Sequence, residues 1–130
     1  MKTALTLLAL LLLTGCSHKS DQAILKNLPG TWHFVSGAKS VDSTFIIATN
    51  GDFTCRSVSL VPTTNPPIEL AGVFQVKDSV LIETVTNSTQ PRIQGRIPFV
   101  SRVQIVKADA HEIVATSDGT DRFVFQKETP

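Results

Sequence analysis

Hydrophobic and polar residues alternate in short runs along most of this 130-residue chain. A period of two is typical of β-strands that bury one face, and turn residues separate the runs. From Thr31 onward no stretch keeps a helical period long enough for a helix of ordinary length. The pattern predicts eight strands, over 31–36, 43–49, 52–60, 69–77, 79–87, 97–108, 111–117 and 122–127.

The connections between these strands are mostly short enough for hairpins, which predicts a meander of sequential antiparallel strands. Asn50-Gly51 suits a two-residue turn with both central residues at positive φ. Lys77-Asp78 is a second short turn, and longer loops follow at 61–68 and 88–96. Before the first strand, residues 23–28 could form one or two helical turns, which Pro29-Gly30 would end.

Within each strand the alternation defines an apolar inner face. In the fifth strand this face is assigned to Val80, Ile82 and Thr84, opposite Glu83, although that strand is apolar on both sides. Eight strands of this kind are enough to close a small barrel whose lumen holds side chains or one small ligand. The predicted fold is therefore all-β, a single eight-stranded antiparallel meander barrel with a short helical turn before it. Elsewhere the inner face comprises Phe45, Ile47, Phe53, Cys55, Phe74, Val76, Phe99, Val103, Ile105, Phe123 and Phe125.

The N-terminus carries an apolar run, Ala4 to Leu13, in which Thr6 is the single polar residue, after one basic residue. It falls short of the roughly 20 residues needed to span a membrane and has the anatomy of a signal peptide. Its last residues, Leu13-Thr14-Gly15-Cys16, resemble the lipobox of bacterial lipoproteins. The resemblance implies a signal peptide over 1–15, lipidation of Cys16, a tether over 16–24 and a barrel domain over 25–130.

Membrane attachment would then come from the acyl chains on Cys16 rather than from a spanning helix. Ser17, directly after the cysteine, is compatible with sorting to the outer membrane of the cell envelope in lipoproteins of this kind. The alternative interpretation is an ordinary signal peptide in which the cysteine is incidental. If Cys16 is acylated, Cys55 has no partner within the chain, and we expect it to be a small buried residue.

Charge argues against nucleic acid as a partner. The whole chain has 12 basic and 11 acidic residues, and cleavage before Cys16 would leave 115 residues with 11 of each. A neutral domain lacks the basic surface that nucleic-acid binding requires.

The segment Leu28-Pro29-Gly30-Thr31-Trp32 resembles the opening signature of lipocalins and of smaller bacterial lipocalin-like domains. In that family the tryptophan packs at the closed end of the barrel, and an arginine near the start of the last strand lies across it. The resemblance therefore assigns barrel closure to Gly30, Trp32 and Arg122.

The family resemblance and the aromatic inner face together predict binding of a small hydrophobic ligand in the lumen. The lining expected for it is Phe45, Ile47, Phe53, Phe74 and Phe125. The alternative is a barrel filled by these same side chains. In that case the loops around 62–67 and 91–96 would bind an envelope protein, and the chain would be an interaction or inhibitor module.

Residue patterns for catalysis are missing from the sequence. His18, His33 and His111 have no spacing that suits a metal site, and no phosphate-binding loop, nucleophile elbow or thiol pair is present. The segment 118–121 is interpreted as a polar hairpin turn. We therefore expect no metal, no cofactor and no enzymatic activity.

Overall fold

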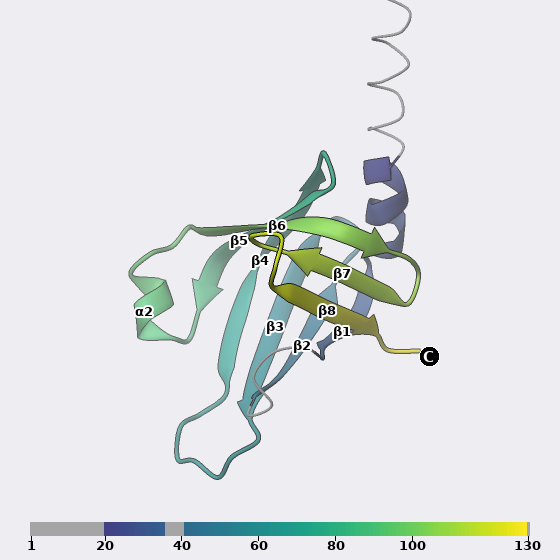
Figure 1. Cartoon of the computed structure of the whole chain (residues 1–130). Coiled ribbons are helices and arrows are strands. Elements are labelled where there is room, and N and C mark those ends of the chain that lie inside the picture. The colour runs from purple at the N-terminus through teal and green to yellow at the C-terminus, as the bar shows by residue number, and fades with distance from the viewer. Residues whose placement is uncertain (1–19, 36–40, 130) are drawn as a thin grey trace, which may run out of the picture.

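A computed structural model describes residues 20–35 and 41–129 of the chain. Cys16 and the rest of the segment that resembles a lipobox lie outside these residues. The described part is a closed antiparallel barrel in which each strand pairs with the next and β1 pairs with β8 (Figure 1). This confirms the predicted eight-stranded meander. The strands are β1 (Gly30–Phe34), β2 (Val41–Ile47), β3 (Asp52–Ser59), β4 (Ile68–Lys77), β5 (Val80–Ser88), β6 (Phe99–Ala108), β7 (Glu112–Thr116) and β8 (Arg122–Lys127).

A helix that includes residues 20–27 packs against one end of the barrel (Figure 1). Residues 20–22, whose polar composition predicts a tether, belong to it. The helix is held in two ways. Ile24 is buried in the main core cluster, and the Asp21 carboxylate accepts the backbone N–H groups of Asp78 and Ser79 at 2.8 and 2.9 Å.

The turn between β4 and β5 is the one with two central residues at positive φ, Asp78 (52°) and Ser79 (61°). The sequence predicts this geometry at Asn50-Gly51 instead, and that prediction is wrong, because only Gly51 has a positive φ there (92°). The Asn50 side-chain oxygen accepts the Asp52 N–H at 3.0 Å. This local bond accompanies a longer turn that ends in a left-handed glycine.

The longer loops lie at the end of the barrel opposite the helix. One connects β3 to β4 through residues 60–67, and another connects β5 to β6 and contains the short helix α2 (Pro91–Gln94) (Figure 1). The sequence predicts a loop at α2. Pro91 stands at the start of the helix, where its missing N–H costs no hydrogen bond.

In β5 the inner face is Leu81, Glu83 and Val85, which corrects the assignment of Val80, Ile82 and Thr84 to that side. Register explains the difference. With Asp78-Ser79 as the turn, Leu81 lies opposite Val76 and Glu83 opposite Phe74. Directly paired residues in an antiparallel sheet share a face, so β5 takes its inner face from β4.

Candidate binding cavity

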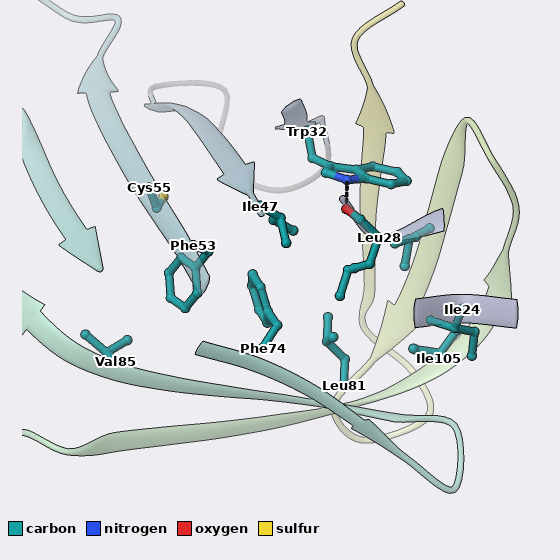
Figure 2. Packing of buried hydrophobic residues seen from close by; sticks show 11 residues of the cluster. Ile24, Leu28, Trp32, Ile47, Phe53, Cys55, Phe74, Leu81, Val85 and Ile105 are labelled. Atoms are coloured by element: carbon teal, nitrogen blue, oxygen red, sulfur yellow. Dashed lines mark hydrogen bonds between the residues drawn. The ribbon is translucent and has the colours of Figure 1, made fainter. Parts of the chain in front are cut away.

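The end of the barrel beneath the helix is closed around Trp32. Its side chain is only 1% exposed, and its indole N–H donates to the Leu28 carbonyl at 2.8 Å (Figure 2). Ile24, Leu28 and Ile105 pack into the same cluster. Trp32 therefore packs at the closed end, the place that the lipocalin resemblance implies for it.

The cation against Trp32 is Lys127. Its Nζ lies 5.3 Å from the ring centre and donates to the Asn27 carbonyl at 2.9 Å. Arg122 stands at the opposite end of β8, paired with Thr116 and exposed. The expectation that Arg122 lies across Trp32 is therefore corrected. β8 runs antiparallel to β1, so its last residues rather than its first reach the closed end.

Gly30 allows this arrangement. Its φ is +136°, and a Cβ added there would collide with Cε of Lys127. Any other residue would combine backbone strain with displacement of the cation from Trp32.

A connected group of phenylalanine rings occupies the centre of the barrel. Phe53 and Phe74 are 4.4 Å apart between ring centroids, and they lie side by side in Figure 2. Phe45 contacts both rings and also Phe125, at 5.8 to 6.1 Å. Tilted and edge-on pairs at these separations are favourable beyond the area they bury.

Between this cluster and the closed end lies a cavity of about 190 Å³. Four of the five predicted lining residues border it, Phe45, Ile47, Phe74 and Phe125, whereas Phe53 packs behind Phe74. An engineered apolar cavity of about 150 Å³ accepts benzene, so the space suits a small, compact molecule. The remaining lining residues are Leu28, Trp32, Leu81, Glu83, Ser101, Val103, Ile113 and Phe123.

Two polar side chains, Glu83 and Ser101, interrupt this apolar lining. They stand opposite each other on β5 and β6. Burial raises the pKa of the Glu83 carboxyl above its ordinary value, because the charged form loses hydration. Within the described ranges no group donates a hydrogen bond to this carboxylate. The sequence interpretation missed Glu83, and the β4–β5 register is the signal that would have found it.

Cys55 lies on β3 two residues after Phe53, toward the end of the barrel that carries the longer loops. It is free and buried, as expected. Burial raises the pKa of its thiol to about 11, the Ser57 hydroxyl opposes the rise, and the charge of Glu83 adds to it. A thiol of this kind stays protonated and unreactive at neutral pH.

The other polar groups considered in the sequence, His33 and the segment 118–121, make local contacts at the surface and in a turn. His33 contacts the Thr44 hydroxyl at 3.3 Å and Glu128 at 3.7 Å, both at the barrel surface. Asp118 accepts the N–H groups of Thr120 and Asp121, which confirms a hairpin turn there and lowers the Asp118 pKa. Across 20–35 and 41–129 no group of His, Cys, Asp and Glu side chains is arranged to hold a metal ion.

A larger hollow, of about 660 Å³, lies on the outside of β2 to β5. Outward-facing side chains such as Thr44, Thr54, Arg56 and Glu69 line most of it. Its lining is mostly exposed and includes the charged Asp42, Arg56 and Glu69, whereas the lining of the lumen is buried or half-buried and mostly apolar. No helix in the part of the chain that is described has the length and hydropathy to cross a membrane.

Comparison with solved structures shows the fold. The chain is similar to a lipocalin-like protein from Bacteroides uniformis, with a TM-score of 0.54 and 12% identity over 78% of this chain and 99% of that one. A second Bacteroides uniformis protein, solved by NMR, gives a TM-score of 0.55 and 10% identity, covering 82% and 93% of the two chains. An uncharacterized protein from Bacteroides eggerthii gives 0.52 and 12%, covering 77% and 98%.

At these identities the likeness concerns the fold alone, which is that of a lipocalin-like barrel. No protein-family model matches the sequence, nor does the sequence of any curated protein.

Proposed function

We propose that this chain is a bacterial lipoprotein, anchored in the cell envelope through Cys16, whose lipocalin-like barrel binds a small hydrophobic ligand in its lumen. The observation that carries the binding role is the 190 Å³ cavity bordered by phenylalanine, leucine and isoleucine side chains around Trp32. Ligand pockets are typically concave, mostly apolar and equipped with few polar groups. The proposal assigns the barrel no catalytic role.

Binding can be tested on residues 17–130, produced without lipid, with toluene as the probe. Trp32 borders the cavity and is the single tryptophan of the chain, so its fluorescence reports occupancy. Toluene should change this fluorescence saturably, and the protein NMR shifts should concentrate on cavity residues.

The matched variants are Phe45→Trp, which fills the centre of the cavity, and Phe99→Trp, on a ring that does not border it. Because each adds a second tryptophan, NMR follows binding in both. Phe45→Trp should abolish toluene binding, and Phe99→Trp should preserve it. No binding to the unmodified domain would indicate a filled barrel and direct attention to protein partners of the loops at 60–67 and 91–96.

Membrane anchoring is a separate test. The resemblance of Leu13-Thr14-Gly15-Cys16 to a lipobox and the apolar run before it support lipidation of Cys16. In a bacterial host the full chain should partition into the detergent phase and incorporate labelled palmitate. Cys16→Ser should lose both properties, and an unchanged Cys16→Ser protein would contradict the anchor.

A further inference from the structure

The lumen holds a carboxylate in surroundings that do not stabilise it. Glu83 lies between Leu81 and Val85 on β5, two residues that Figure 2 shows pointing into the barrel. Phe74 is its partner on β4 and Ser101 its partner on β6. A negative charge among such groups is costly unless it is protonated or paired with a cation.

No protein cation among the described residues faces Glu83 as a partner. The titratable groups on the inner side of the other strands are the Cys55 thiol on β3, whose pKa the charge of Glu83 raises, and the Lys127 ammonium on β8, which lies over Trp32. Cys55 is neutral and Lys127 is held at the closed end by Trp32 and Asn27. The walls from β2, β4 and β6 contribute Phe45, Phe74, Val103 and Ser101, which carry no charge.

The aromatic rings around the cavity complement a cation as well. Phe45, Phe74, Phe123, Phe125 and Trp32 all border it, and the faces of such rings attract positive charge. An apolar ammonium ion would therefore find a carboxylate, ring faces and the Ser101 hydroxyl in one small space. A ligand anion would be repelled, and a neutral hydrocarbon would strip Glu83 of hydration without replacing it.

Resting on the proposed lumenal binding, we infer that the barrel selects a small organic ammonium ion, an amine with a compact apolar body, whose charge pairs with Glu83. The amine nitrogen donates to the carboxylate, and the apolar body packs between Phe45, Phe74 and Phe125. Binding favours the ionised carboxyl, so amine affinity rises with pH as Glu83 loses its proton.

The test compares benzylamine, toluene and benzoate, measured by NMR titration against residues 17–130 at pH 7. Benzylamine should bind about tenfold or more tightly than toluene, in line with a charge-assisted hydrogen bond, and benzoate should not bind. In Glu83→Gln the advantage of benzylamine should vanish, while toluene should bind at least as well as before. Glu69→Gln, which removes an exposed carboxylate on β4, should leave all three affinities unchanged.

The outcomes separate the two proposals. If toluene binds and benzylamine gains nothing over it, or keeps its advantage in Glu83→Gln, the amine inference is overturned and lumenal binding stands. If no probe binds, lumenal binding falls and the inference with it. Should Glu83→Gln fail to fold, the wild-type protein still decides: benzylamine affinity must fall as the pH is lowered through the Glu83 pKa, and toluene affinity must not.

Discussion

Lys127 and Trp32 close the barrel together: the lysine ammonium lies 5.3 Å from the centre of the indole ring, and the two residues are direct partners in the β1–β8 ladder. The same ammonium donates to the carbonyl of Asn27, the last residue of the N-terminal helix. One side chain therefore connects the last strand, the first strand and the helix.

Replacing this cation should weaken the closed end. Lys127→Met keeps the aliphatic stem and loses the charge and the hydrogen bond, and we expect a loss of about 1 kcal/mol in the free energy of unfolding. The fluorescence of Trp32 should shift at the same time. Arg122→Met is the control, because Arg122 lies at the other end of β8. A fluorescence shift in Arg122→Met but not in Lys127→Met would contradict the assignment.

Gly30→Ala should destabilise the domain by about 1–2 kcal/mol through backbone strain and the collision with Lys127. Gly119→Ala separates the two causes. Gly119 also has a positive φ (+87°), but nothing lies within 4 Å of an added Cβ there. Urea unfolding should show a larger loss for Gly30→Ala, and equal losses would mean that the contact with Lys127 contributes nothing.

Asp21 should hold the helix on the barrel. Asp21→Asn removes the charge and one of the two oxygens that accept the Asp78 and Ser79 N–H groups, at an expected cost of about 1 kcal/mol. Hydrogen exchange at the Ser79 amide should accelerate. Gln22→Ala, at the exposed neighbouring position, should leave that amide protected. Unchanged exchange in Asp21→Asn would show that the helix does not depend on this bond.

Glu83 should make stability depend on pH. Its pKa is raised in the folded barrel by burial, so its contribution to stability is fully present below the ordinary value of 4.5 and is lost as the pH rises through the raised pKa. At pH 7, Glu83→Gln should therefore be more stable than the wild type by about 1 kcal/mol. The difference should disappear below pH 4.5. Glu69→Gln should show no such dependence, and a Glu83→Gln protein that is less stable at pH 7 would contradict the prediction.

Cys55 should react only when the barrel opens. In a chain that starts at residue 17 it is the single thiol, and its pKa of about 11 leaves little thiolate at pH 8. Labelling with a disulfide reagent should be slow and should accelerate with urea along the unfolding curve. Ser59→Cys, at the exposed end of β3, supplies a fast-reacting comparison thiol. Rapid labelling of Cys55 in the absence of urea would show that the lumen admits solvent at that level.

The alternation of apolar and polar residues is sufficient to predict the strands and most of the residues that line the cavity. Phe45, Ile47, Phe74 and Phe125 border the cavity because a strict period of two keeps them on one side of their strands. The pattern assigns the wrong inner face to β5, because both sides of that strand are apolar and alternation does not show which side faces the lumen. Placing the turn at Lys77-Asp78 instead of Asp78-Ser79 shifts the strand by one residue, and a shift of one residue exchanges the two faces. For that reason the sequence pattern places Glu83 on the outer face of β5 instead of in the lumen wall.

The closed end depends on contacts between distant parts of the chain. Nothing local distinguishes Lys127 from Arg122 as the partner of Trp32, since both are basic residues of the same strand. Only the antiparallel pairing of β1 with β8 selects the residue at the C-terminal end. The helical residues 20–22 are a similar case, because the Asp21 carboxylate meets a turn 57 residues further along the chain.

The pairing of β1 with β8 also constrains the order of events in biosynthesis. A nascent chain carries both edges of the sheet, β1 and its most recent strand, with unpaired backbone groups until residues 122–127 have emerged. Such open edges are templates for pairing with other chains. The closed barrel has none, so protection from aggregation arrives in a single step, when β8 pairs with β1.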